Sequence, residues 1–227
     1  MNLTRDSWTG LYRAGAFCAG AAVLLYAAGL VVVAVTEGPP AAGGASILAY
    51  VGTHRTLYIV RQLLWLTPSV FLMVVSLALA VALRHLGRSF AAVAGLFGVA
   101  SWAVSLAWPT TGDGSPAMVV LSDGYASTAS AAGRAPFVAG AEVLTALNAV
   151  PSAIGVVQTL GILLISLLML RGVFPAGLAW LGVATGAVGV VSEALRPVLG
   201  WAYALYGLLL FAWLAWVAIA LWRKARS

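Results

Sequence analysis

Six stretches of the 227-residue chain are long and apolar enough to cross a lipid bilayer, and they constrain its fold more than any other feature. A helix needs about 20 apolar residues to cross a hydrocarbon layer about 30 Å thick. Hydrophobic residues make up 63% of the chain and charged residues only 8%, against roughly a quarter charged in an ordinary soluble domain. Because backbone groups in lipid must pair within their own segment, these stretches predict helices.

The fold expected from this pattern is all-α, a polytopic bundle of six transmembrane helices with two long outer loops. It forms a single integral membrane domain over residues 1–227. The predicted spans are residues 14–35, 62–83, 90–108, 151–170, 174–192 and 198–222. The first stretch follows a basic start, as a signal peptide does, but its apolar part is too long for one, so we interpret it as a span.

The basic residues fall unequally on the two sides of such a bundle. Eight lie on the side of the termini and four on the other: Arg5, Arg13, Arg84, Arg88, Arg171, Arg223, Lys224 and Arg226, against Arg55, Arg61, Arg134 and Arg196. Cytoplasmic loops carry the excess of arginine and lysine, so both termini are predicted to be cytoplasmic. Eleven arginines to one lysine, with abundant alanine and glycine, are typical of a GC-rich bacterial genome. We therefore expect a bacterial cytoplasmic (inner) membrane.

The connections between spans differ in length. Two short ones, residues 84–89 and 171–173, predict antiparallel hairpins. Two long outer loops are expected at residues 36–61 and 109–150, and long loops are commonly functional or disordered. Within the second, residues 137–150 form either a separate amphipathic helix or an extension of span four with a kink at Pro151.

Small residues recur at helical spacing in the predicted spans. In span five, Gly182, Gly186 and Gly189 lie on one face. Helices in lipid associate by close approach over such faces. The pattern favours packing within one chain, with homodimer formation as the alternative.

Ionisable and amide groups near the spans define the predicted ligand site, because charges are costly inside a bilayer. The arginines would hold an anionic group and the other residues would orient it. The predicted ligand-binding set is Arg61, Arg134, Glu142, Asn148, Glu193 and Arg196. For the last two, an interfacial ion pair that merely ends span five is the competing interpretation.

A second polar group follows spans two and four at helical spacing. Its members are Gln62, Ser69, Ser152, Gln158 and Thr159. Such residues serve either as hydrogen bonds between helices or as the floor of a pocket that opens outward. We refer to them as the polar seam.

Motifs for known catalytic and cofactor chemistry are missing from the sequence. There is no HExxH, CxxC, GxGxxG, GxxxxGK[ST] or GxSxG. His54 and His85 flank span two, on the order of 45 Å apart along a helix, so they cannot share a metal or haem. A single cysteine, Cys18, allows no disulfide and no thiolate cluster. The sequence predicts no metal, no cofactor and no catalytic residue.

One segment of the second half suggests a family. Arg171-Gly-Val-Phe-Pro175 is followed by Leu178-Ala-Trp-Leu-Gly182, and the last span ends in Trp222-Arg-Lys. This resembles a large group of bacterial six-span membrane proteins known only as a domain of unknown function. The resemblance is sharpest from Arg171 to Gly189 and implies a six-span fold without an established activity.

The function that we expect is binding of a small or lipid-like, anionic ligand in an outward-facing polar pocket, with transport as an extension. One alternative is an accessory or assembly subunit of a larger membrane complex. Another is a membrane-embedded hydrolase or transferase that uses Glu142 and Glu193 as acid and base on a lipid head group. The expected partners are membrane lipids, a small-molecule ligand, and a larger complex or a second copy. No nucleic acid is expected, because no basic run exceeds Arg223-Lys224.

Overall fold

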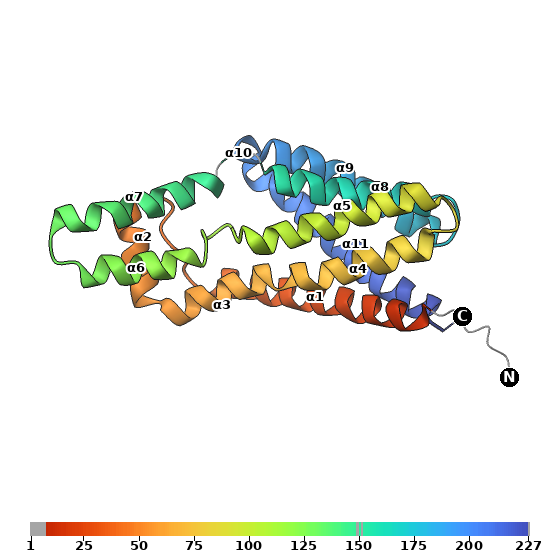
Figure 1. Ribbon diagram of the computed structural model, residues 1–227, viewed down its shortest axis with the longest axis horizontal. Helices are drawn as coiled ribbons and strands as arrows, with labels where there is room; N and C mark the ends of the chain where they lie inside the picture. Colours follow the sequence, from red (N-terminus) through yellow and green to blue (C-terminus); the bar gives the residue numbers. More distant parts are fainter. Residues whose placement is uncertain (1–7, 149, 151, 227) are drawn as a thin grey trace. The chain divides into compact units, whose positions relative to one another are not determined.

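The structure is a computed structural model, and it describes residues 8–148, 150 and 152–226. Helices account for 82% of the described residues, among which there is no strand (Figure 1). The prediction of an all-α fold is therefore confirmed.

The helices group into two compact units. Unit 1 comprises Met1–Leu24, Thr67–Ala107 and Pro151–Ser227, and unit 2 comprises Leu25–Leu66 and Trp108–Val150. Helix α1, Thr9–Val35, contributes its first part to unit 1 and its last part to unit 2. The expectation of one integral membrane domain stays a prediction.

Unit 1 is built from long helices that pack as neighbours. They are α4 (Pro68–Leu83), α5 (Arg88–Ala107), α8 (Ala153–Met169), α9 (Ala176–Ala194) and α11 (Tyr203–Lys224), with the short α10 (Arg196–Leu199) and the 3₁₀ helix η1 (Gly200–Ala202) before α11. Helix α4 packs on α5, α5 on α8, α8 on α9, and α9 on α11 (Figure 1). The short connections after α4 and α8 form the two predicted hairpins, and Gly172 turns the second with a φ of 104°.

Glycines set the closest approaches between helices of unit 1. A Cβ at Gly186 of α9 would lie 2.6 Å from the backbone of Leu163 in α8. A Cβ at Gly98 of α5 would lie 2.7 Å from the side chain of Ser76 in α4. Real side chains do not tolerate such distances, so these helices meet only because the glycines lack a Cβ. The glycine face predicted in span five thus packs within the chain.

Five helical segments are long and apolar enough to cross a membrane: Thr9–Val35, Arg55–Leu83, Arg88–Ala107, Ala176–Ala194 and Tyr203–Lys224. They carry large apolar side chains on their surfaces, and Phe17 and Leu24 of α1 are each 72% exposed. Such surfaces suit lipid rather than water. The chain therefore has the character of a membrane protein. Helix α8, at 17 residues, is shorter than these five, so the six-span count stays a prediction.

The last span begins later than predicted. Its predicted start is Val198, but α10 and η1 occupy residues 196–202 and α11 begins at Tyr203. Pro197 starts a new helical turn because it has no N–H to continue α9. Gly200 then ends α10 with a φ of 50°, a conformation that favours glycine.

Unit 2 corrects the prediction of two long loops, because most of both segments is helical. Its helices are α2 (Gly44–Thr53), α3 (Arg55–Leu66), α6 (Ala117–Ser127) and α7 (Ala131–Asn148). Helix α2 crosses both α6 and α7 (Figure 1). The buried core consists of Ile47, Leu48, Val51, Tyr58, Met118 and Ala141. Short helices gain most of their stability from such packing, which a search for spans does not detect.

Residues 137–148 belong to α7, not to the fourth predicted span. Helix α7 ends at Asn148, and α8 begins at Ala153 after Ser152. The Ser152 side chain accepts a hydrogen bond from the Gly155 N–H at 3.0 Å, the usual contact of a helix N-cap. The structure thus favours a separate helix. The predicted kink at Pro151 lies outside the described residues.

Candidate functional site

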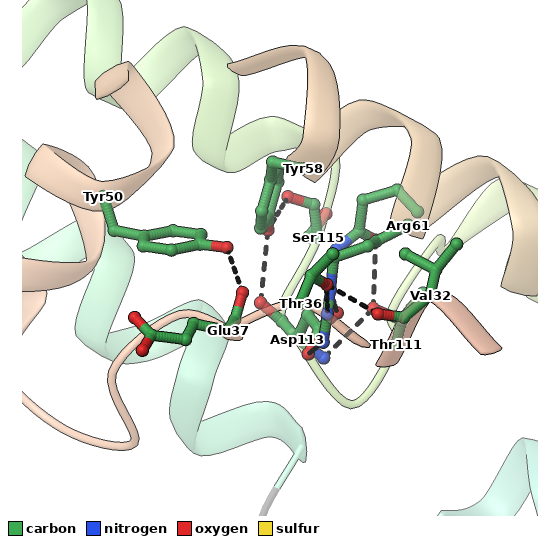
Figure 2. Close-up of polar contacts among 10 residues, drawn as sticks. Val32, Thr36, Glu37, Tyr50, Tyr58, Arg61, Thr111, Asp113 and Ser115 are labelled. Carbon is green, nitrogen blue, oxygen red and sulfur yellow. Dashed lines mark hydrogen bonds and ion pairs between the residues drawn. The ribbon is translucent and has the colours of Figure 1, made fainter. Parts of the chain in front are cut away.

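Two groups of buried polar side chains stand out in the described part of the chain, one in each unit. In unit 2, Arg61 of α3 is only 3% exposed. Its Nε donates to Oδ2 of Asp113 at 2.6 Å and its Nη2 donates to Oδ1 at 3.0 Å. Its Nη1 donates to Oγ1 of Thr36, next to the end of α1, at 2.8 Å (Figure 2). The guanidinium and carboxylate thus form a bidentate pair, a strong geometry for an ion pair.

Asp113 is held in place by a tight turn. The backbones of Thr111 and Gly114 exchange hydrogen bonds of 2.7 and 3.0 Å, and Gly114 has a φ of 117°. The side chain of Thr111 donates to Oε1 of Gln62 at 3.0 Å. The hydroxyl of Tyr58 donates to the carbonyl of Ser115 at 2.9 Å (Figure 2). Three side chains of α3 therefore hold this turn.

We call this group the Arg61 cluster; it consists of Thr36, Tyr58, Arg61, Gln62 and the turn 111–115. All three nitrogens of the Arg61 guanidinium donate to groups within it. A buried arginine whose three nitrogens all donate within the protein is poorly suited to capture a further anion. The contacts favour a structural role, in which the cluster ties α3 to two distant parts of the sequence.

Tyr50 lies beside the cluster and adds a further tie. Its hydroxyl donates to the carbonyl of Glu37 at 2.6 Å (Figure 2). Burial raises the pKa of Tyr50, and the negative charges of Asp113 and Glu37 raise it further, while the positive charge of Arg61 lowers it. The phenol is thus protonated at neutral pH and can act as the donor.

In unit 1, the second group joins Glu193 at the end of α9, Arg196 at the start of α10 and Tyr203 at the start of α11. Oε2 of Glu193 lies 2.8 Å from Nη2 of Arg196. The Tyr203 hydroxyl donates to Oε1 of Glu193 at 2.6 Å and accepts from Nη2 of Arg196 at 3.1 Å. The guanidinium carbon also lies 5.3 Å from the centre of the Tyr203 ring. We call these three residues the Glu193 site.

Helix α8 forms the floor of the Glu193 site. Gly155 lies directly under the Glu193 carboxylate, where any Cβ would overlap it. The Ser152 N–H donates to the backbone carbonyl of Glu193 at 3.2 Å. The Tyr206 ring meets Tyr203 edge-on, with 5.9 Å between ring centres. These contacts fix the carboxylate and the phenol, and through them the guanidinium.

The Glu193 site keeps unused hydrogen-bonding capacity. Arg196 engages its neighbours through Nη2 alone, and no hydrogen bond joins its Nε or Nη1 to a residue that the structure describes. Its side chain is 32% exposed, whereas that of Glu193 is 4% exposed. Burial acts to lower the pKa of Arg196, but Tyr203 and the Glu193 carboxylate outweigh it, so the pKa is raised. The guanidinium is therefore a fixed cation whose unengaged donors are Nη1 and a buried Nε.

The other residues of the predicted ligand set lie in unit 2 and contact their own neighbourhood. Nε of Arg134 donates to the carbonyl of Thr128 at 2.6 Å, and its guanidinium lies over the ring of Tyr125. Glu142 is exposed and accepts a long 3.5 Å hydrogen bond from the Gly44 N–H. Asn148 ends α7, and its side chain lies outside the described part.

The polar seam is divided between the two units. Gln62 belongs to the Arg61 cluster, whereas Ser69, Ser152, Gln158 and Thr159 lie in unit 1. The Gln158 amide donates to the Ser105 hydroxyl of α5, and Thr159 donates back to the Gly155 carbonyl at 3.0 Å. A cavity of about 10 Å³ lies beside Ser76 and Gln158, enough for about one water molecule. These contacts suit the interpretation of the seam as bonding within and between helices.

Sequence reasoning missed three partners, Tyr58, Asp113 and Tyr203. Asp113 lies 52 residues from Arg61, and no helical period links the two. Tyr203 follows Arg196 by seven residues, but Pro197 and Gly200 break the register between them. By contrast, Glu193 and Arg196 are three residues apart, and their ion pair follows directly from helical spacing.

Within residues 8–148, 150 and 152–226, no three histidine, cysteine or acidic side chains gather closely enough to hold a metal ion. The Glu193 site supplies one carboxylate, one guanidinium and one phenol. That set can bind an anionic or hydrogen-bonding group. No protein-family model, curated protein or solved structure matches the chain.

Proposed function

We propose that this protein is a multi-pass membrane protein that binds a small or lipid-like ligand through an anionic group at the Glu193 site. The observation that carries the proposal is Arg196, whose side chain is part exposed and whose Nη2 is held by two neighbours, while Nη1 is unengaged. Carboxylates and phosphates accept charge-assisted hydrogen bonds from arginine, which suits an anionic oxygen of a ligand at Nη1.

The arrangement supports binding because the cation needs little ordering. Glu193 and Tyr203 hold Nη2, so ligand binding does not have to immobilise a free arginine side chain. Groups fixed in advance lose less conformational entropy on binding. Glu193 neutralises part of the charge, which favours a ligand with both a donor and an anionic group over a bare anion.

The proposal keeps the bacterial cytoplasmic membrane and cytoplasmic termini expected from the basic residues. It narrows the ligand set to Glu193 and Arg196 and adds Tyr203. That the ligand also contacts Arg61, Arg134, Glu142 and Asn148 stays a prediction. The same holds for transport, for an assembly role in a larger complex, and for a hydrolase or transferase that uses Glu142 with Glu193.

Native mass spectrometry of protein extracted in the mildest effective detergent tests the proposal. The wild type should retain a small molecule or lipid, and Arg196→Gln should retain about tenfold less, because a charge-assisted contact is lost. Arg223→Gln is the matched control, since it removes an exposed arginine remote from the site in sequence. If Arg196→Gln and Arg223→Gln retained the same ligand equally, the Glu193 site would not be its binding site.

A second measurement separates ligand loss from misfolding. The thermal stability of the wild type should rise on addition of inorganic phosphate or acetate as simple anionic probes. Arg196→Gln should unfold cooperatively without this rise. A stoichiometric protein in place of a small molecule would instead support the assembly role.

A further inference from the structure

A groove of about 400 Å³ runs between α4 and α5 on the surface of unit 1. Its sides are apolar and include Leu77, Ala80, Leu96 and Val99, and its lining also includes Arg84 and Arg88. The volume lies within the range of ligand pockets, roughly 300–1,000 Å³. The groove is distinct from the Glu193 site, which lies on α9, α10 and α11.

The groove follows from the way in which α4 and α5 pack. A Cβ at Gly95 of α5 would lie 2.7 Å from the Cβ of Ala80 in α4, so the two backbones approach closely there. The small side chains form a low floor. Leu77 and Leu96 stand at its sides and are 48% and 67% exposed. Both helices belong to segments that are long and apolar enough to span a membrane.

The two arginines mark one end of the groove. Arg84 follows the last residue of α4, and Arg88 is the first residue of α5. Both are exposed. Arg84 donates to the Val81 carbonyl at 3.2 Å and lies over the ring of Trp8, and neither contact supplies a negative charge.

No carboxylate in the described part of the chain forms an ion pair with either arginine. Asp123, Asp113 and Glu193 pair with Arg55, Arg61 and Arg196. The groove thus combines an apolar channel with two adjacent positive charges that no carboxylate of the described residues neutralises. A molecule that complements it has an apolar chain and an anionic head.

We propose that the α4–α5 groove binds one anionic phospholipid, with an acyl chain between Leu77 and Leu96 and its phosphate between Arg84 and Arg88. Basic pockets between membrane helices bind anionic head groups, and arginine holds phosphate oxygens with two donors at once. The acyl chain fills the space that the small residues leave. The two arginines make the site selective for anionic over zwitterionic lipids.

The test uses the full chain, stripped of lipid and exposed to an equimolar mixture of phosphatidylglycerol and phosphatidylcholine in detergent micelles. Native mass spectrometry reads the lipids that stay bound. The wild type should retain phosphatidylglycerol preferentially, and Arg84→Gln/Arg88→Gln should reduce the ratio of retained anionic to zwitterionic lipid about tenfold. Arg223→Gln, a change of one exposed arginine outside the groove, should leave the ratio near that of the wild type.

A second variant tests the channel without touching charge. Ala92 lines the groove and is exposed, so Ala92→Phe should fill it and lower the retention of both lipids. Leu208→Phe, at a position 66% exposed on α11, is the matched control and should change nothing.

Equal retention of both lipids by the wild type would overturn the proposal. So would a dimer of the protein that loses its association in Ala92→Phe, because a second copy would then occupy the groove. Competition by free inorganic phosphate without any bound lipid would show that the arginines bind the anion alone, which also contradicts it. None of these results depends on Arg196, so they test the groove independently of the proposed ligand binding at the Glu193 site.

Discussion

Arg61 is enclosed by protein, and its charge is matched by the carboxylate of Asp113. In Asp113→Ala the guanidinium would stay buried without a countercharge. Loss of one partner of a buried ion pair costs roughly 3–5 kcal/mol, and we expect the lower end because Asp113 is 18% exposed. Unfolding in mixed detergent micelles measures this loss.

The exposed pair of Arg55 and Asp123 provides the control. Their side chains are 51% and 57% exposed, so Arg55→Gln should cost less than about 1 kcal/mol. The double variant Arg61→Leu/Asp113→Ala should recover much of the stability, because it removes the buried charge as well. Equal costs for Asp113→Ala and Arg55→Gln would contradict the structural role of the Arg61 cluster.

Gly114 and Gly112 flank Asp113 and differ in how well each position would accommodate a side chain. Gly114 has a φ of 117°, and a Cβ there would lie 3.0 Å from the Tyr58 hydroxyl. A Cβ at Gly112 would meet nothing within 4 Å. Gly114→Ala should therefore lower the free energy of unfolding by about 1–3 kcal/mol, and Gly112→Ala by much less. Similar losses in thermal unfolding for both variants would mean that the turn is not held as described.

The Tyr50 phenol makes the stability of the folded protein depend on pH. Its pKa is raised in the folded protein, so its contribution to stability is complete below the ordinary tyrosine pKa of about 10 and is lost as pH rises through the folded value. The difference in tyrosinate absorbance between the wild type and Tyr50→Phe should appear at higher pH in the folded than in the unfolded protein. A coincident titration in both states would rule out the burial that we assign to this phenol.

At the scale of helices, the α8–α9 contact depends on the missing side chain of Gly186. Gly186→Ala places a Cβ 2.6 Å from the Leu163 backbone, which cannot move as a flexible side chain would. Overpacking of this kind costs about 1–3 kcal/mol. Gly207→Ala on α11 meets nothing within 4 Å and should be neutral or slightly stabilising. Thermal unfolding of the two variants should therefore diverge, and a neutral Gly186→Ala would show that these helices pack less closely.

Long helices were predictable from the sequence, but short ones were not. A stretch of about 20 apolar residues has few alternatives in a membrane, so α1, α5 and α9 begin and end within a few residues of their predicted spans. Helices α2, α6 and α7 depend on the core around Leu48 and Met118, which joins segments far apart in the chain. No local pattern predicts that core, so α2 and α6 fell in segments predicted as loops, and only the part of α7 from residue 137 was anticipated as a helix.

In the candidate sites, contacts between residues close together in the sequence were easier to predict than contacts between distant residues. Glu193 and Arg196 are three residues apart, and their ion pair was anticipated as a competing interpretation. Arg84 and Arg88 were used to predict orientation, but the groove between their helices depends on how closely Gly95 approaches Ala80. The bond between Arg61 and Asp113 closes a loop of 52 residues, and nothing in the sequence selects that carboxylate over the others.

For the whole molecule, labelling of single cysteines tests both the orientation and the number of spans. Cys18 is the only cysteine, so Cys18→Ala gives a background without thiols. With six spans and a cytoplasmic N-terminus, an impermeant thiol reagent outside the cell should label Ser130→Cys but not Arg226→Cys. If α8 did not cross the membrane, both would be labelled, and labelling of Arg226→Cys alone would invert the predicted orientation.

The bond between Arg61 and Asp113 also has a consequence for biosynthesis. Arg61 leaves the ribosome 52 residues before its partner, which at 5–20 residues per second is roughly 3–10 s. During that interval the α3–α4 segment, one of the apolar candidates for a span, contains a cation without its carboxylate. Arg61 must therefore stay hydrated, or pair with another anionic group, until the turn that contains Asp113 has been synthesised. Unit 2 ends at Val150, whereas unit 1 includes Pro151–Ser227, so the ion pair can form before the chain of unit 1 has been completed.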